Sequence, residues 1–219
     1  MNEKFPIAQE AFPFLLVTLG TSLAFALGGL WQGTVIGLLL SGYILFFFRN
    51  PDRIVPAGVD QVACPADGKV IYVGPAVEKE FLNEERTKIS IFMSLFDVHI
   101  NRMPLDATVR DLKYHPGRFL AAFDDRACEE NERNAVLMET TRGETFVVVQ
   151  IAGLIARRIV CYPSKGSFLM KGQRFGLIQF GSRVDIYLPP KAEALVKVGD
   201  RVSGGESLLA KLIRESAHA

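Results

Sequence analysis

A glycine followed by a serine, Gly181-Ser182, lies inside an apolar run from Phe175 to Leu188 that predicts one long strand broken at Gly176 and Gly181. Serine is a weak strand former, and glycine in a strand usually marks a bulge or a close approach of two backbones. The pair also suits another chemistry, because a strained glycine carbonyl beside a serine hydroxyl is what an N→O acyl shift needs. The resulting ester can eliminate to dehydroalanine, which hydrolyses to a pyruvoyl group and ammonia. The two letters alone leave the bulge and the self-cleaving bond open as alternatives.

Self-cleavage at Ser182 would need a base to take the hydroxyl proton and a group to orient that base. His99 is the best candidate for the base, because it directly follows a predicted strand. Asp67 lies in an Asp-Gly turn and could orient the imidazole. A structural histidine and an ordinary turn aspartate are the alternatives. His115 has the setting of a loop residue, and His218 lies in the C-terminal tail.

The stretch from Phe12 to Phe48 is almost wholly apolar, and no charged residue lies between Glu10 and Arg49. A break at Gly28-Gly29 or Gln32-Gly33 gives two helical arms of about 17 residues, each about 25 Å long, which is near the minimum for a membrane span. We therefore predict a tight helical membrane hairpin over residues 1–48. A single tilted span and helices buried in a protein core are the alternatives. Flanking basic residues favour the cytoplasmic side for both ends: Lys4, Arg49 and Arg53.

From residue 49 onward, short β-prone runs alternate with turn signals such as Asp67-Gly68 and Arg142-Gly143. One helix, near residues 119–130, interrupts them. We predict a mostly-β, sandwich- or barrel-like domain with short helices over residues 49–219. The expected strands are Lys69–Val73, Lys88–Met93, Thr108–Tyr114, Ala135–Thr140, Thr145–Ile151, Ile155–Cys161 and Leu177–Leu188.

Composition excludes several classes of function. The net charge is +1, with 25 basic and 24 acidic residues, so no nucleic-acid partner is expected. The three cysteines, Cys64, Cys128 and Cys161, are odd in number and lack a CxxC spacing, which indicates reduced core thiols. No phosphate-cradling glycine motif and no clustered metal ligands are present, so neither pyridoxal phosphate nor a metal is expected. Turns at 65–70 and 198–205 resemble those of biotinyl- and lipoyl-carrier barrels, which makes a membrane-anchored, non-enzymatic carrier-like barrel one further alternative.

Taken in order, several motifs after residue 49 resemble phosphatidylserine decarboxylase in its short form. The motifs are Pro65-Ala66-Asp67-Gly68, Asp97-Val98-His99-Ile100-Asn101-Arg102, Gly117-Arg118-Phe119-Leu120, Glu129-Glu130-Asn131-Glu132-Arg133-Asn134, Ile151-Ala152-Gly153, Arg157-Arg158-Ile159-Val160 and Phe180-Gly181-Ser182-Arg183-Val184-Asp185. The resemblance covers nearly the whole chain beyond residue 49 and follows the order of motifs in the family.

The resemblance implies a carboxy-lyase that converts phosphatidylserine to phosphatidylethanolamine and CO₂ through a Schiff base with a pyruvoyl group made from Ser182. It implies that Asp67, His99 and Ser182 form a triad that cleaves the Gly181–Ser182 bond. The products would be a β chain, 1–181, and an α chain, 182–219, associated as a heterodimer that could oligomerise further. The expected location is the inner cell membrane, where a phospholipid substrate lies, with the catalytic domain on the cytoplasmic side that the basic residues favour. A related serine phospholipid is the alternative substrate.

The chain departs from the longer family members in two places. They carry a Leu-Gly-Ser-Thr type of cleavage sequence, where this chain has Phe180-Gly181-Ser182-Arg183. They also carry a second histidine three residues after the first, where this chain has Arg102, so the role of that histidine does not carry over. Arg102 could instead bind the substrate carboxylate or phosphate, because a guanidinium matches both groups bidentately. A structural ion pair is the alternative for Arg102.

Overall fold

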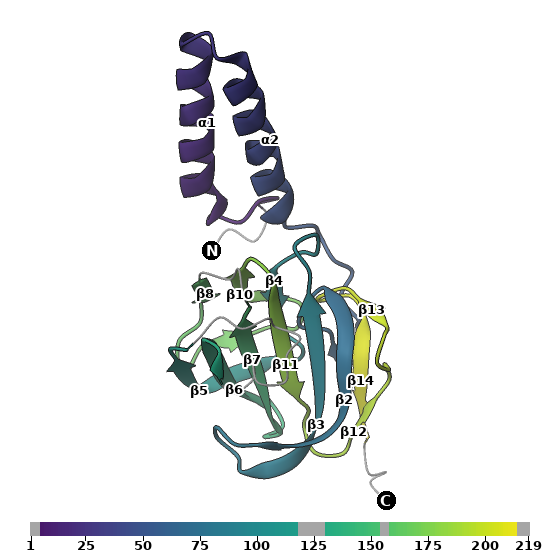
Figure 1. The fold of residues 1–219 in the computed structure, drawn as a ribbon. Coiled ribbons are helices and arrows are strands. Elements are labelled where there is room, and N and C mark those ends of the chain that lie inside the picture. Colours follow the sequence, from purple (N-terminus) through teal and green to yellow (C-terminus); the bar gives the residue numbers. More distant parts are fainter. Residues whose placement is uncertain (1–4, 118–129, 154–157, 214–219) are drawn as a thin grey trace, which may run out of the picture. The chain divides into compact units, whose positions relative to one another are not determined.

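The computed structural model describes residues 5–117, 130–153 and 158–213 (Figure 1). It divides into two compact units, Met1–Asp52 and Arg53–Ala219. The first unit is helical, and the second is built almost entirely from β-strands. The architecture is thus mostly β, as the sequence predicts, and its two helices lie in the N-terminal unit.

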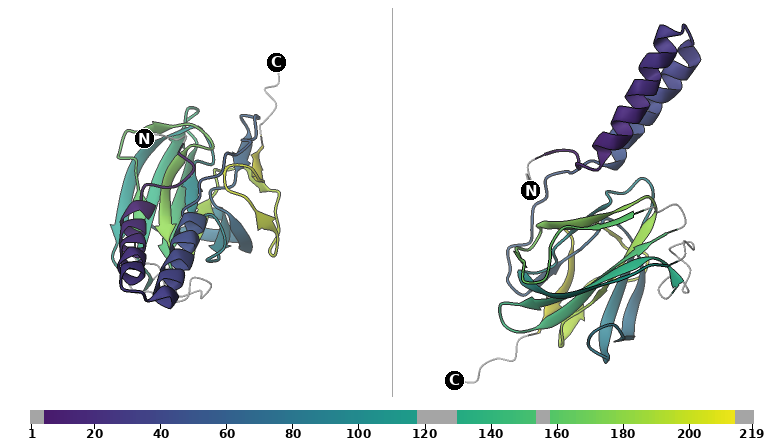
Figure 2. Two further views of the ribbon diagram at one scale, coloured as in Figure 1. Left: turned by 90° about the horizontal axis from the view of Figure 1, so that it is seen from above. Right: turned by 90° about the vertical axis from the view of Figure 1, so that its left-hand side faces the viewer.

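The N-terminal unit is a pair of helices, α1 (Ala11–Leu27) and α2 (Trp31–Phe47), which lie side by side in both views of Figure 2. A side-chain hydrogen bond joins the two helices, because Ser41 Oγ donates to Thr18 Oγ1 at 2.8 Å. None of the helices in the described ranges combines the length and apolar character needed to cross a membrane. The two helical arms are therefore confirmed, and the membrane hairpin is not. Large apolar side chains remain exposed along both helices, among them Leu16, Leu23, Leu27, Trp31, Ile36 and Leu39.

The second unit is organised around one curled eight-stranded sheet with antiparallel pairings (Figures 1 and 2). Runs of β-branched residues such as Val147-Val148-Val149 form its centre, because such side chains pack well on a pleated surface. In order across the sheet, the strands are β13 (Arg201–Val202), β2 (Gly68–Glu78), β3 (Glu84–Met93), β11 (Ser182–Tyr187), β7 (Thr145–Ala152), β6 (Arg133–Thr140), β5 (Ala107–His115) and β9 (Phe168–Leu169).

Two three-stranded sheets complete the unit. One has the order β4 (Ile100–Arg102), β10 (Arg174–Gln179) and β8 (Arg158–Cys161). The other has the order β1 (Gln61–Ala63), β14 (Leu208–Leu212) and β12 (Ala192–Ala194).

Alternate side chains of the large sheet enter two different apolar clusters. Ile91, Val184 and Ile186 belong to the main core, whereas Val149 and Ile151 belong to a smaller cluster that Phe81, Leu82 and Tyr187 cover. Successive side chains of a strand point to opposite faces of a sheet. Residues of β11 with even numbers, Ser182 included, therefore face the main core.

The predicted strands between residues 69 and 151 are all confirmed, with longer bounds in the structure. The strand predicted over 155–161 is observed as β8, and its first three residues lie outside the described ranges. The single broken strand predicted over 177–188 is instead two strands in two different sheets, β10 and β11, which separate at Phe180-Gly181. At Gly176 the strand continues, with a shift in register against β4. The helix predicted near 119–130 lies outside the described residues, apart from its last position.

Candidate active site

The link between β10 and β11 is a turn in which two residues have left-handed backbones. The φ angle is +65° at Phe180 and +45° at Gly181. Glycine reaches this region at little steric cost, whereas a residue with a side chain is strained there by about 1 kcal/mol or more. A Cβ on Gly181 would lie 3.9 Å from the Leu95 side chain, an ordinary contact, so conformation rather than lack of space favours glycine. The candidate scissile bond, Gly181–Ser182, therefore directly follows a strained turn.

Ser182 opens β11 and is completely buried between two neighbouring strands. It lies opposite Met93 of β3 and Ala152 of β7. Its hydroxyl donates to the Sδ atom of Met93 at 3.4 Å. Because a thioether is a weak acceptor, this contact places the hydroxyl without engaging it in a strong hydrogen bond. Such a hydroxyl can turn toward the neighbouring carbonyl carbon at lower cost than one held by a carboxylate.

Three buried amide side chains form a hydrogen-bonded chain that ends at the same sulfur atom. Asn134 Nδ2 donates to Gln150 Oε1 at 3.1 Å, and Gln150 Nε2 donates to Asn101 Oδ1 at 2.8 Å. Asn101 Nδ2 then lies 3.9 Å from Met93 Sδ. The direction of the chain is fixed by a backbone group, because Gln150 Nε2 also donates to the carbonyl oxygen of Val160 at 3.3 Å, and a carbonyl only accepts. The amide N–H of Asn101 therefore points at the sulfur atom that the serine hydroxyl contacts.

Gln150 and Asn134 are not among the site residues predicted from sequence, although the sequence contains a signal for them. Gln150 is the polar residue in the otherwise apolar run of β7, and Asn134 lies directly opposite it on β6. A buried amide must find partners, so a glutamine in the middle of a core strand predicts a polar partner on an adjacent segment. Asn101 belongs to a motif already noted, but its contact with Met93 could not be inferred from sequence.

His99 is buried immediately before β4, and its ring is oriented by the backbone. Nδ1 lies 3.0 Å from the carbonyl oxygen of Asp97. Because a carbonyl oxygen only accepts, Nδ1 carries the proton in this contact, which assigns the lone pair of the neutral ring to Nε2. The tautomer thus has the form that a general base uses.

The Asp67 carboxylate is held by two donors. Arg53 Nη2 donates to Oδ2 at 2.6 Å, and the amide of Gly204 donates to Oδ1 at 2.7 Å. Burial raises the pKa of the Asp67 carboxyl above its ordinary value, the two donors oppose that shift, and the nearby charge of Asp97 adds to it. The next residue, Gly68, must be glycine, because a Cβ there would collide with the carbonyl oxygen of Phe92.

The three predicted catalytic residues come from segments that meet at the end of β3. Ser182 pairs with Met93, the last residue of that strand, and the turn that follows the strand leads directly to His99. Asp67 precedes the strand that pairs with β3. In the described part of the chain, the carboxylate of Asp67 binds Arg53 and Gly204 rather than His99. The structure therefore brings the segments together without an Asp67–His99 hydrogen bond, and the catalytic roles stay predictions.

Arg102 ends β4, where its Nη1 donates to the carbonyl oxygen of Gly172 at 3.1 Å. The stem of its side chain lies over Gly205, since a Cβ at that glycine would be 2.6 Å from Arg102 Cδ. Arg102 lies three residues after His99 in the chain. It belongs to β4, whereas the strained turn at Phe180-Gly181 joins β10 to β11.

The other titratable candidates have structural settings. His115 Nε2 lies 2.9 Å from Glu80 at the surface. Burial raises the pKa of Cys64 to about 12 and that of Cys161 to about 11, which keeps both thiols neutral near physiological pH. Cys128 and His218 lie outside the described residues. Within the described ranges, no group of three or more histidine, cysteine or acidic residues could hold a metal ion.

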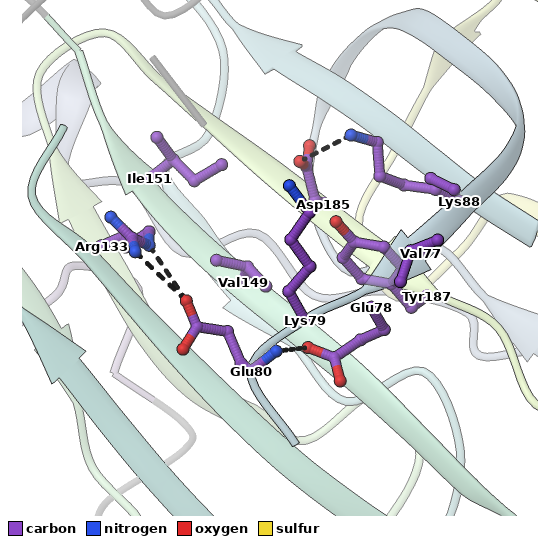
Figure 3. Close-up of a pocket in the computed structure, with 11 residues that line it drawn as sticks. Val77, Glu78, Lys79, Glu80, Lys88, Arg133, Val149, Ile151, Asp185 and Tyr187 are labelled. Atoms are coloured by element: carbon purple, nitrogen blue, oxygen red, sulfur yellow. Dashed lines mark hydrogen bonds and ion pairs between the residues drawn. The ribbon is translucent and has the colours of Figure 1, made fainter. Parts of the chain in front are cut away.

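A cavity of about 460 Å³ lies on the face of the large sheet opposite to the one that Ser182 faces (Figure 3). Two ion pairs lie in its lining, with Lys88 Nζ 3.6 Å from Asp185 and Arg133 Nη2 3.2 Å from Glu80. Asp185 is an odd number of residues from Ser182 on the same strand, so the two side chains face opposite sides of the sheet. We therefore do not assign the reaction to this cavity.

Comparison with known proteins gives a consistent set of relatives. A sequence model for the family described as phosphatidylserine decarboxylase matches residues 40–210. The chain is 51% identical to the phosphatidylserine decarboxylase proenzyme of Geobacter sulfurreducens, over 95% of this chain and 97% of that protein. It is 50% identical to the proenzyme of the same name from Geotalea uraniireducens, with the same coverage, and 46% identical to that of Nitratidesulfovibrio vulgaris over 99% of both chains.

Proposed function

The chain belongs to the phosphatidylserine decarboxylase family, a family of carboxy-lyases, and we propose that it is a self-cleaving, pyruvoyl-dependent enzyme that converts phosphatidylserine to phosphatidylethanolamine and CO₂. The observation that carries this proposal is the position of Gly181-Ser182. The serine is buried at the start of β11, directly after a turn with two left-handed residues. Family membership argues against a carrier-like barrel without enzymatic activity.

In the proposed maturation, Nε2 of His99 takes the hydroxyl proton while Oγ of Ser182 attacks the carbonyl carbon of Gly181. The C–N bond between the two residues breaks, the nitrogen takes up the proton, and an ester joins them. Loss of the Cα proton of Ser182 expels the Gly181 carboxylate and leaves dehydroalanine. Addition of water and release of ammonia then produce the pyruvoyl group. The weak acceptor beside the hydroxyl and the strained turn before it support the first of these steps.

A pyruvoyl group at Ser182 would supply a carbonyl that accepts the substrate amine and takes up the electron pair left by CO₂. The position fits such a group, because the new N-terminal residue would stay between β3 and β7 in a buried, largely apolar setting. Burial keeps water from the reacting carbon. The side-chain amide of Asn101, which points at the Met93 sulfur atom, is an oriented hydrogen-bond donor next to this position. We propose that Arg102 contacts an acidic group of the substrate.

The two proposed chains would remain associated after cleavage. The α chain, 182–219, supplies β11 between β3 and β7, β13 beside β2, and β14 beside β1. All of these partner strands belong to the β chain, 1–181. Breaking one peptide bond leaves these ladders intact, which supports an α/β heterodimer as the mature form.

The intact mass of the purified full-length protein tests this function. We expect two chains with the boundaries 1–181 and 182–219, the smaller of which resists Edman degradation because a pyruvoyl group has no amine. Borohydride added together with phosphatidylserine should add lipid mass to the small chain alone, in step with loss of activity. A single uncleaved chain after prolonged native incubation would overturn the proposal.

We also propose that the helical pair of α1 and α2 attaches the enzyme to the cytoplasmic face of the inner membrane. Support comes from the large apolar side chains exposed on both helices and from the lipid substrate. Removing residues 1–48 should leave self-cleavage intact, because no proposed catalytic residue lies there, while activity on phosphatidylserine vesicles falls. Vesicle flotation and turnover measure this effect. Equal flotation and equal turnover with and without the segment would contradict it.

Arg53→Gln should slow self-cleavage and move its pH dependence. Asp67 must be ionised to orient a base, and Arg53 is one of the two donors that hold its pKa down. Its removal should raise the Asp67 pKa further, so the acidic limb of the rate profile should move to higher pH and the rate should recover as pH rises. Proenzyme half-life between pH 5 and 9 is the measurement. Glu206→Gln is the control, because it removes the other carboxylate that Arg53 binds and leaves the Asp67 contact in place. An unshifted profile in Arg53→Gln would show that this ion pair has no role in cleavage.

A further inference from the structure

Arg174 is a buried cation without a counter-charge. It opens β10 and is 6% exposed, and its buried Nε atom has no hydrogen-bond partner. Across the described ranges, no ion pair or side-chain hydrogen bond reaches its guanidinium. Among the arginines that the structure describes, two others are similarly buried, Arg86 and Arg183, and each binds a carboxylate, at 2.7 Å and 2.6 Å respectively. Burial of an unpaired charge is costly, so the exception at Arg174 calls for an absent partner.

A second arginine lies directly opposite. In the β4–β10 ladder, Arg174 pairs with Arg102. Like charges in directly opposed positions of an antiparallel pair destabilise the sheet. An anion at this end of the ladder would reduce the repulsion between the two facing guanidinium groups and accept a hydrogen bond from Nε of Arg174.

This ladder end is close to the candidate active site. β4 is three residues long and begins immediately after His99. At about 3.3 Å per residue, the Cα atoms of His99 and Arg102 are separated by at most about 10 Å. The facing pair Arg102 and Arg174 is therefore joined to His99 by one short strand.

Resting on the function proposed above, we propose that Arg174, together with Arg102, binds the phosphate group of the phospholipid headgroup. The planar guanidinium matches phosphate oxygens bidentately. The phosphodiester is a better occupant than the substrate carboxylate, because an arginine bound to the carboxylate would stabilise the ground state against loss of CO₂. The phosphodiester keeps its charge throughout the reaction and can stay bound from substrate to product.

The first experiment measures thermal unfolding of the mature full-length protein in detergent, and it does not depend on activity. In phosphate-free buffer, Arg174→Met should raise the melting temperature, because it removes an uncompensated buried charge. Inorganic phosphate, compared with chloride at equal ionic strength, should stabilise the wild type and not Arg174→Met. Arg158→Met is the matched control, since Arg158 is an exposed arginine in the same three-stranded sheet. A lower melting temperature for Arg174→Met, together with an unchanged response to phosphate, would show that Arg174 is structural.

The second experiment measures turnover of phosphatidylserine in mixed micelles. Arg174→Met should self-cleave normally and show a KM about ten- to a hundredfold higher, with a much smaller change in kcat, because a charge-assisted contact present in both ground and transition states is lost. Arg174→Lys keeps the positive charge but lacks the planar guanidinium, so its KM should lie between those of the wild type and Arg174→Met. Arg158→Met should match the wild type. An unchanged KM in both Arg174 variants would overturn the assignment.

Two further arms distinguish the source of the phosphate. Glycerophosphoserine, the soluble headgroup, should compete with substrate in the wild type and lose that effect in Arg174→Met. If only phosphatidylglycerol vesicles stabilise the wild type, the site binds an accessory anionic lipid and the substrate assignment is wrong. If the wild type releases no CO₂ from phosphatidylserine, the proposed function fails, while the phosphate-dependent unfolding of the two proteins still decides whether Arg174 binds an anion.

Discussion

Ser182→Ala is expected to leave the protein as one uncleaved chain with no decarboxylase activity. The substitution removes the Oγ atom that attacks the Gly181 carbonyl in the proposed mechanism, and with it the source of the pyruvoyl group. It should cost little stability, because the hydroxyl makes a weak contact to the Met93 sulfur and hydrogen bonds of ordinary strength contribute about 1 kcal/mol. Intact mass and release of CO₂ from labelled phosphatidylserine measure the two losses. Thermal unfolding checks that the variant is folded.

The matched control for this variant is Ser90→Ala. Ser90 is also completely buried, on the adjacent strand β3, but its hydroxyl accepts a hydrogen bond from Arg183 Nη2 at 2.9 Å and has no role in the proposed chemistry. Arg183 keeps its two hydrogen bonds to Asp185 in this variant, so folding should survive. Ser90→Ala should cleave and decarboxylate like the wild type. Cleavage of Ser182→Ala at the same peptide bond would remove the acyl-shift mechanism.

The large sheet was accessible from sequence because its strands are local, periodic and bounded by turn residues. The error at 177–188 shows where that information ends. Both halves of the run have strand propensity, and glycine is a visible breaker, but the positive φ at Phe180 belongs to a residue type that gives no such signal. Only the tertiary structure, which places β10 and β11 in different sheets, forces the chain to turn there.

The site residues also divide into those that the sequence reveals and those that only the structure reveals. Asp67, His99 and Ser182 lie in motifs of consecutive residues, so a sequence reveals them. Their partners do not, because they come from distant segments: Gln150 binds Asn101 across 49 positions, and Gly204 binds Asp67 across 137. Such pairs depend on the order of strands in the sheets. The missing partner of Arg174 is likewise visible only once its surroundings are known.

His99→Ala is expected to slow self-cleavage by a factor of about 10² to 10⁴, which is typical for the loss of a positioned general base. The bond from Nδ1 to the Asp97 carbonyl assigns the lone pair to Nε2, and His99 follows shortly after Met93, the residue of β3 that pairs with Ser182. Proenzyme half-life, followed by intact mass, gives the ratio of rates. His115→Ala is the control, because that histidine pairs with Glu80 at the surface, and it should mature at the wild-type rate.

The His99 experiment also separates orientation by the backbone from orientation by Asp67. If the Asp97 carbonyl alone sets the tautomer, Asp67→Asn should slow cleavage much less than His99→Ala does, since the asparagine oxygen can still accept the hydrogen bond from the Gly204 amide. If the carboxylate must first leave Arg53 and reach the imidazole, Asp67→Asn should be as slow as His99→Ala. In that case Arg53 competes with His99 for the Asp67 carboxylate. At high pH, Arg53→Gln should then cleave faster than the wild type, instead of only recovering the wild-type rate. Normal maturation of His99→Ala would exclude His99 as the base and leave His115 as the next histidine to test.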